Sequence, residues 1–347
     1  MKTAVVLCPG RGTYNATELG YLARHFPDAG LLSRFDTMRR EMNQPALSEL
    51  DGAAKFSLAL HSRGDNASGL IYAATVGDFL SIDREAVRVV AVTGNSMGWY
   101  SALACAGAVG LEDGFRISNT MGTLMQRAMI GGQLVYPWLE EDWHPRPERK
   151  AELLRLVSEI AARPGHHLYL SIDLGGLLVL AGNEEGLKAF EASVEPVQGR
   201  FPMRLGNHAA FHTPLQGPVA AEGGATLPPV LFKRTQLPMI DGRGHVWWPG
   251  AYDAATAHSY TFGHQVVEAY DFTAAIRTAA REFAPDLFVV TGPGTTLGGA
   301  VAQSLILAGW RGMQDKTTFR GLQDREPFLV SMGMDDQRSL VTKGEKR

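Results

Sequence analysis

Three short apolar runs constrain this chain most, because each is rich in β-branched residues and each stops at a glycine turn. They cover residues 3–7, 87–93 and 286–290, and segments with helical spacing follow them. Nearly continuous apolar runs are typical of strands that are buried on both faces. Their alternation with helices predicts an α/β fold, in which helices cover a parallel sheet.

A different order of elements interrupts this pattern between residues 132 and 206. The spacing there predicts strand, helix, strand, strand, helix and strand, at 133–138, 148–162, 167–172, 177–181, 184–194 and 201–205. This βαββαβ order is that of ferredoxin-like domains. We therefore predict a small domain at 132–206, inserted into a core of residues 1–131 and 207–320. A C-terminal segment and solvated tail would occupy 321–347.

Charge and cysteine content exclude several classes of protein. The 347 residues carry a formal charge of −3, from 33 basic and 36 acidic side chains, so the chain lacks the positive field that nucleic-acid binding requires. Cys8 and Cys105 are too few for a disulfide framework or a thiolate metal cage. The first apolar run ends before it could serve as a signal peptide, and no later run could span a membrane. These features predict a cytoplasmic protein.

The sharpest local motif is Gly94-Asn95-Ser96-Met97-Gly98, a G-x-S-x-G between a predicted strand and a predicted helix. This context is that of a nucleophile elbow, in which a tight turn exposes the serine hydroxyl at the end of the sheet. The alternative is a serine that caps a helix. The flanking strand and helix favour Ser96 as a nucleophile.

A serine nucleophile needs a base, and two histidines compete for that role. His212 follows the return from the predicted insertion, where a loop would pass over the carboxyl edge of the sheet. His208 lies about one turn earlier. Sequence spacing alone does not separate them.

Four motifs, in the same order, resemble the malonyl-CoA:acyl carrier protein transacylase family. They are C-P-G-R-G-T at 8–13 (F-P-G-Q-G-S in the family), G-N-S-M-G-W-Y-S-A-L at 94–103 (G-H-S-L-G-E-Y-S-A-L), A-F-H-T-P-L at 210–215 (A-F-H-S-P-L) and T-G-P-G-T-T-L at 291–297 (G-P-G-x-x-L). The predicted insertion falls where the family has its ferredoxin-like subdomain. The resemblance implies an α/β-hydrolase-like core and acyl transfer through an acyl-Ser96 ester, with His212 as the base.

The resemblance also implies the other catalytic groups. The oxyanion hole would consist of the backbone N–H groups of Met97 and Arg11. The family's histidine is oriented by a backbone carbonyl within a segment Q-L-x-x-P-V-x-W. The similar stretch here is 265–272, which implies Asp271 as the orienting residue, through either its carbonyl or its carboxylate.

Departures from the family pattern concern the acyl group. The family's R-G-K-x-M-Q segment carries an arginine for the malonyl carboxylate, and here the segment reads M-G-T-L-M-Q from Met121 to Gln126. The resemblance implies Met121, Gln126 and Asn95 as acyl-binding residues. A malonyl carboxylate without a cation would be buried unpaired, so either the acyl group is not carboxylated or Arg11 replaces the missing cation. The other interpretation of Met121 is core filling.

The function implied is transfer of an acyl group to acyl carrier protein, from CoA or from another carrier. The group would be malonyl by family, or a non-carboxylated acyl group. Phosphopantetheine would be part of the substrate, with no separate cofactor and no metal. Two alternatives are a hydrolase that clears acylated carrier proteins and a catalytically silent carrier-binding module. Fatty acid and polyketide synthesis are both compatible with this reading.

Overall fold

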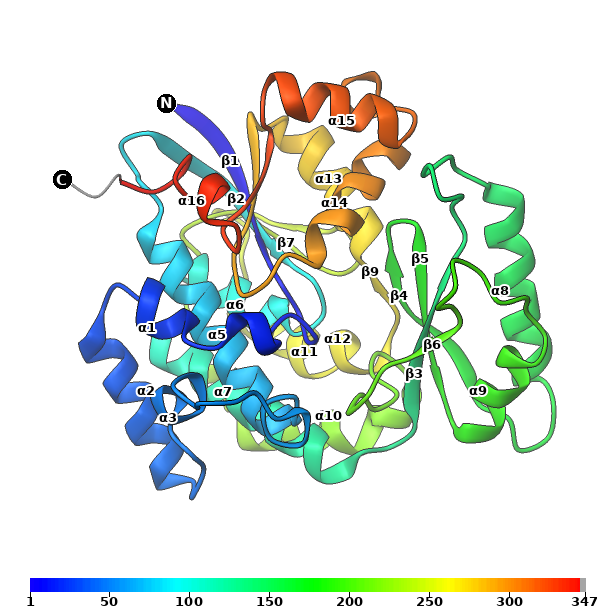
Figure 1. Cartoon of the computed structure of the whole chain (residues 1–347). Coiled ribbons are helices and arrows are strands. Elements are labelled where there is room, and N and C mark those ends of the chain that lie inside the picture. The colour runs from blue at the N-terminus through cyan, green and yellow to red at the C-terminus, as the bar shows by residue number, and fades with distance from the viewer. Residues whose placement is uncertain (344–347) are drawn as a thin grey trace.

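The computed structural model describes residues 1–343 as a large α/β part and a smaller part beside it (Figure 1). The sequence analysis predicted a C-terminal segment and tail at 321–347, and residues 344–347 of it lie outside the described residues. None of the helices within residues 1–343 combines the length and apolar character needed to span a bilayer.

A six-stranded sheet forms the large part, in the order β11-β10-β1-β2-β7-β8. Its strands are β1 (Lys2–Cys8), β2 (Val87–Gly94), β7 (Met239–Ile240), β8 (Val246–Trp247), β10 (Leu287–Val290) and β11 (Leu329–Ser331). The pairs from β11 to β7 are parallel, and β8 is antiparallel to β7. Strands β1 and β10 are buried at almost every residue. The predicted fold class is therefore confirmed.

Helices cover both faces of this sheet. In Figure 1, α5 (Gly64–Ser81), α6 (Gly98–Cys105) and α7 (Leu111–Ala128) lie on one side, and α13 (Phe272–Phe283) and α14 (Leu297–Leu307) lie on the other. The remaining helices of the large part are α1 (Tyr21–His25), α2 (Ala29–Glu41), α3 (Leu47–Asp51), α4 (Leu58–His61), α10 (Gly217–Thr226), α11 (Ala254–Phe262), α12 (His264–Val267), α15 (Lys316–Arg325) and α16 (Asp335–Arg338).

The smaller part contains a five-stranded sheet in the order β6-β3-β5-β4-β9. Its elements are β3 (Gly132–Pro137), α8 (Pro147–Ala161), β4 (Leu168–Leu174), β5 (Leu177–Gly182), α9 (Glu184–Glu191), β6 (Met203–Arg204) and β9 (Tyr270–Asp271). The first four strands are antiparallel neighbours, as the βαββαβ prediction requires. In Figure 1, α8 and α9 lie on the outer side of this sheet, away from the large part.

Two connections between distant segments could not be read from the sequence. Strand β9, far along the chain from the inserted unit, pairs in parallel with β4 and joins the two parts. Strand β11 lies in the range that was expected to form a C-terminal segment, yet it belongs to the main sheet. The following Arg338 donates to the buried carboxylate of Asp78 on α5 at 2.5 Å, which fastens this segment to the core.

Gly98 at the start of α6 touches the end of β1, so we predict that Gly98→Ala destabilises the fold. A Cβ there would lie 2.1 Å from the carbonyl oxygen of Cys8. The expected loss is about 3 kcal/mol of unfolding free energy or more, at the upper end for single substitutions, and urea unfolding measures it.

Gly298→Ala is the matched control, because Gly298 also lies in the first turn of a helix and a Cβ there meets no atom within 4 Å. This change should leave stability equal or raise it by up to about 1 kcal/mol, through better helix propensity. Equal stability of the two variants would contradict the role given to Gly98.

Candidate active site

A strained turn between β2 and α6 carries Ser96. Ser96 has a φ of +55°, in the left-handed region that side chains other than glycine rarely adopt. Glycine neighbours make the turn possible: a Cβ at Gly94 would lie 2.2 Å from the carbonyl carbon of Gly98, and one at Gly10 would lie 2.5 Å from the carbonyl oxygen of Asn95. The predicted strand–turn–helix context of a nucleophile elbow is present.

The hydroxyl of Ser96 meets the ring of His212, although 116 residues separate them. Ser96 Oγ lies 2.7 Å from Nε2 of His212. The histidine also has a positive φ, +55°, and only 4% of its surface is exposed. It follows directly after the chain returns from the smaller part, as the sequence predicted.

A backbone carbonyl orients the histidine. Nδ1 of His212 lies 2.7 Å from the carbonyl oxygen of Gln265. Because a carbonyl can only accept, Nδ1 carries the proton and donates it, which leaves the Nε2 lone pair facing Ser96. The pair is therefore held in the tautomer that a general base needs.

The expectation that Asp271 orients the histidine needs correction. The carboxylate of Asp271 accepts from the backbone N–H of Ala274 and caps α13. Its backbone N–H donates to Gly242. The orienting carbonyl comes from Gln265, the first residue of the stretch that the resemblance pointed to. The glutamine that opens this stretch was the available signal.

His208, the rival base, has a different partner. Its Nδ1 lies 2.8 Å from Oε1 of Gln133 on β3. Sequence spacing left the two histidines open, and the structure places the ring of His212, not that of His208, against Ser96 Oγ.

The side chain of Gln265 was missed by the sequence analysis. Its amide Nε2 donates to the backbone carbonyl of Ser96 at 3.1 Å, and its Oε1 accepts from the hydroxyl of Tyr100 at 3.2 Å. One residue therefore holds the histidine through its backbone and the serine turn through its side chain.

Burial controls the protonation of His212. Desolvation lowers its pKa to about 4, and the hydrogen bond to the Gln265 carbonyl opposes this shift only in part. The imidazole is consequently neutral at pH 7 and free to accept a proton from Ser96.

Two backbone N–H groups beside Ser96 are available to an oxyanion. Among residues 1–343, neither the N–H of Arg11 nor that of Met97 has a hydrogen-bond acceptor. Met97 immediately precedes α6, so its N–H lies at the positive end of the helix. These are the two donors that the resemblance implied, and their role in catalysis stays a prediction.

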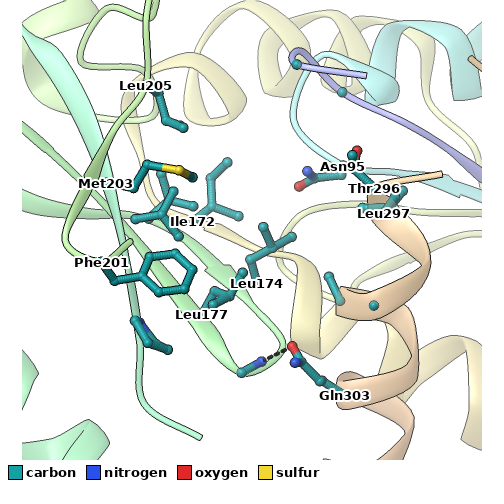
Figure 2. Close-up of a pocket in the computed structure, with 18 of the residues that line it drawn as sticks. Asn95, Ile172, Leu174, Leu177, Phe201, Met203, Leu205, Thr296, Leu297 and Gln303 are labelled. Atoms are coloured by element: carbon teal, nitrogen blue, oxygen red, sulfur yellow. Dashed lines mark hydrogen bonds between the residues drawn. The ribbon is translucent and has the colours of Figure 1, made fainter. Parts of the chain in front are cut away.

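Ser96 opens onto a large cavity between the two parts of the molecule. This cavity has a volume of about 800 Å³. In Figure 2, apolar side chains from the smaller part line one wall, among them Ile172, Leu174 and Phe201, and Asn95 and Thr296 lie across from them. A pocket of this size and mixed polarity is typical of small-molecule sites.

A second, much smaller cavity also borders the serine. Its volume is about 20 Å³, room for about one water-sized group. Ser96, His212 and Arg11 all contribute to its lining. Ser96 and Arg11 thus line both cavities.

Of the three residues predicted to bind the acyl group, the structure places only Asn95 in the lining of a cavity. Asn95 lines the large cavity, and its Oδ1 is buried without a hydrogen-bond partner among the described residues. Gln126 instead accepts from the backbone N–H of Gly64 through Oε1, at 2.7 Å, and ties α7 to α5. Its assignment as an acyl-binding residue needs correction.

Met121 also needs correction as an acyl-binding residue, because it is fully buried and lines neither cavity. Its sulfur would lie 2.6 Å from a Cβ at Gly223 of α10, so Met121 fills the space between two helices. The interpretation as core filling is the one that the packing supports. From the same helix, Gly122 and Met125 reach the small cavity instead.

No metal site accompanies this constellation in the part of the chain that the structure describes. Residues 1–343 contain no group of three or more His, Cys, Asp or Glu side chains arranged to hold a metal ion.

The fold and the Ser96–His212 pair define the class: an α/β protein with a serine on a strained strand–helix turn, a histidine hydrogen-bonded to it, and an inserted ferredoxin-like unit. The solved structures it resembles are malonyl-CoA:acyl carrier protein transacylases. That of Xanthomonas oryzae superposes with a TM-score of 0.75, over 97% of this chain and 96% of that one, at 18% identity. That of Synechocystis gives 0.74, over 98% and 100%, at 16% identity. These likenesses confirm the fold.

Sequence comparison agrees with this family resemblance. A phenolphthiocerol synthesis polyketide synthase of Mycobacterium marinum is 27% identical over a region that covers 88% of this chain and 14% of that protein. A malonyl CoA-acyl carrier protein transacylase of Salmonella typhimurium is 23% identical over 43% of this chain and 46% of the relative. The chain thus matches less than half the length of each of these relatives. No protein-family model matches it.

The lowered pKa of His212 predicts the pH dependence of acyl loading on Ser96. Protonation of Nε2 removes the base, so the loading rate should stay level from about pH 8 to about pH 5 and fall near pH 4, below the usual imidazole value of about 6.5. Single-turnover loading, followed by intact mass, measures this profile.

A folding control must accompany that measurement. A histidine that is neutral in the folded state binds its proton more readily after unfolding, so stability also declines as the pH falls below about 6.5. Circular dichroism at each pH separates unfolding from loss of the base. An inflection at or above pH 6.5 in a folded protein would contradict the assignment.

Gln265→Leu tests the side-chain role of Gln265 while keeping its backbone carbonyl. Loss of the hydrogen bond to the Ser96 carbonyl should lower the loading rate roughly 5- to 10-fold, with little change in KM and an unchanged pH profile. Tyr100→Phe, which removes only the Tyr100–Gln265 hydrogen bond, should have a smaller effect. A wild-type rate in Gln265→Leu would exclude this positioning role.

Proposed function

We propose that the protein is an acyltransferase that moves an acyl group from a CoA or carrier thioester to acyl carrier protein through an ester on Ser96. The observation that carries the proposal is the hydrogen-bonded chain from Ser96 Oγ through His212 to the Gln265 carbonyl, at the edge of the large cavity. A nucleophile, a base and an orienting acceptor are the parts that acyl transfer requires.

In the first half-reaction, Ser96 Oγ attacks the thioester carbonyl carbon and its proton passes to Nε2 of His212. The backbone N–H groups of Arg11 and Met97 receive the oxyanion. Collapse breaks the carbon–sulfur bond, and the departing thiolate takes the proton back from His212. In the second half-reaction, a carrier thiol gives its proton to Nε2 of His212 and attacks the ester carbonyl carbon. The carbon–oxygen bond to Ser96 then breaks, and Ser96 Oγ takes the proton back from His212.

The Gln265 carbonyl stabilises the imidazolium that forms in each half-reaction, because it accepts the hydrogen bond from Nδ1–H. A neutral carbonyl does this less strongly than a carboxylate would. The lowered pKa of His212 is consistent with that weaker support.

The relatives support the same class of reaction and partner. Their names state malonyl-CoA:acyl carrier protein transacylase activity or polyketide synthesis. Another structure with this fold, at a TM-score of 0.70 and 19% identity, contains a type II polyketide synthase acyl carrier protein with its malonyl-transacylase. We propose an acyl carrier protein as acceptor here too, in fatty acid or polyketide synthesis. The phosphopantetheine arm would be part of the substrate, with no separate cofactor.

The proposed setting is the cytoplasm, in keeping with two buried, unpaired cysteines. The large cavity is the proposed entry route for the phosphopantetheine arm, because it is the larger of the two spaces that meet at Ser96.

Ser96→Ala tests the proposal. Wild-type protein incubated with malonyl-CoA should gain one acyl group, seen by intact mass, and should pass it to added holo acyl carrier protein. The variant should gain none, because it lacks the hydroxyl that forms the ester.

Product analysis in the same assay separates the alternatives. Free acid without acyl carrier would identify a hydrolase, and absence of an adduct with every thioester offered would identify a silent binding module. A Ser96→Ala variant with unchanged turnover would overturn the serine mechanism.

A further inference from the structure

Arg11 places a cationic side chain beside Ser96, and two nitrogens of its guanidinium have no hydrogen-bond acceptor among the described residues. Its loop touches the serine turn: a Cβ at Gly10 would lie 3.4 Å from the Cβ of Ser96. Arg11 lines the large and the small cavity together with Ser96. Its guanidinium also lies over the ring of Phe211, next to the catalytic histidine, with Cζ 5.6 Å from the ring centre.

One nitrogen of this guanidinium is firmly held. Nη2 donates to the carbonyl oxygens of Ser62 and Asn207, at 2.9 and 2.8 Å. The two acceptors are far apart in the sequence, one just before α5 and one just after the smaller part, and they are hydrogen-bonded to each other through Asn207 Nδ2 and the Ser62 hydroxyl. They fix the position of the cation before any ligand arrives, which is the preorganisation that a binding group needs.

The other two nitrogens are unpaired. Within residues 1–343, neither Nε nor Nη1 of Arg11 has a hydrogen-bond acceptor, and Nε is buried. Burial lowers the pKa of Arg11 to about 10, so the group is still charged at pH 7. The nearby carboxylate of Asp65 forms its ion pair with Arg63, at 2.9 Å, rather than with Arg11. A partly buried cation with a buried, unpaired donor is costly unless an acceptor completes it.

We propose that Arg11 binds a free carboxylate on the acyl group, and that the substrate is therefore a short acyl thioester with a terminal carboxylate, of the malonyl type. This inference rests on the proposed function and adds a specificity-determining residue to it. Among the described residues that line the small cavity, Arg11 is the sole lysine or arginine. The volume of about 20 Å³ in the small cavity favours a short group over a long chain there.

This assignment also explains how position 121 can be methionine. Met121 is buried against α10 and contributes nothing to either cavity. The cation reaches the nucleophile from the loop after β1 instead of from α7. The chain thus lacks the family's arginine at position 121 but has an arginine at position 11, where the family has glutamine.

The test compares acyl loading on Ser96 from malonyl-CoA and from acetyl-CoA, which lacks the carboxylate, by intact mass at early times. Wild-type protein should favour malonyl. Arg11→Met should lower the malonyl-to-acetyl ratio by about tenfold or more, since the buried carboxylate loses its charged partner. Arg11→Lys, which keeps the charge, should retain more of that ratio than Arg11→Met.

Arg116→Met is the matched control, because it makes the same change at an exposed arginine. Arg116 lies near Asp113 of its own helix and lines neither cavity. Its malonyl-to-acetyl ratio should equal that of the wild type, whatever the change in overall rate.

The outcomes separate this inference from the proposed function. Loading from both thioesters with an unchanged ratio in Arg11→Met would show a purely structural arginine and overturn the inference. A wild-type preference for acetyl-CoA would overturn it without any variant, even if the variants fail to fold. No Ser96 adduct from any thioester would instead overturn the proposed function, and the inference with it.

Discussion

The close approach of two loops at the carboxyl edge of the main sheet is the constraint on which the site depends. The loop after β1 and the turn after β2 meet where a side chain at Gly10, Gly94 or Gly98 would collide with backbone atoms. The backbone N–H of Asn95 also donates to the carbonyl of Cys8, at 2.9 Å. This contact holds the serine in its left-handed conformation and places Arg11 beside it.

The properties of His212 depend on other interactions, namely its burial and its hydrogen bond to the Gln265 carbonyl. Burial makes His212 a neutral imidazole, and a carbonyl rather than a carboxylate sets its tautomer. An acid in that position would favour the charged imidazole and raise its pKa. Gln265 joins this arrangement to the serine turn, so Ser96 and His212 are both positioned by one residue of the short helix α12.

The two parts of the molecule line the large cavity beside Ser96 with different kinds of groups. In Figure 2 the smaller sheet presents apolar side chains, and the start of α14 lies across from them. The loop of Arg11 and the serine turn line the cavity from the large part as well. Strand β9 binds the two parts through parallel pairing with β4. The geometry of the cavity therefore depends on a strand that lies outside the inserted unit.

Local sequence determined the buried strands, the βαββαβ order and the elbow at Ser96, because apolar periodicity and glycine turns act over a few residues. The resemblance added His212 and the two backbone donors, through short motifs. Tertiary structure showed that His212, and not His208, meets Ser96, which sequence spacing had left open. It moved the orienting carbonyl from Asp271 to Gln265 and placed Met121 and Gln126 outside both cavities. It also showed that Arg11 has unpaired donors. These outcomes depend on which side chains meet across more than a hundred residues, and that is settled by packing rather than by spacing along the chain.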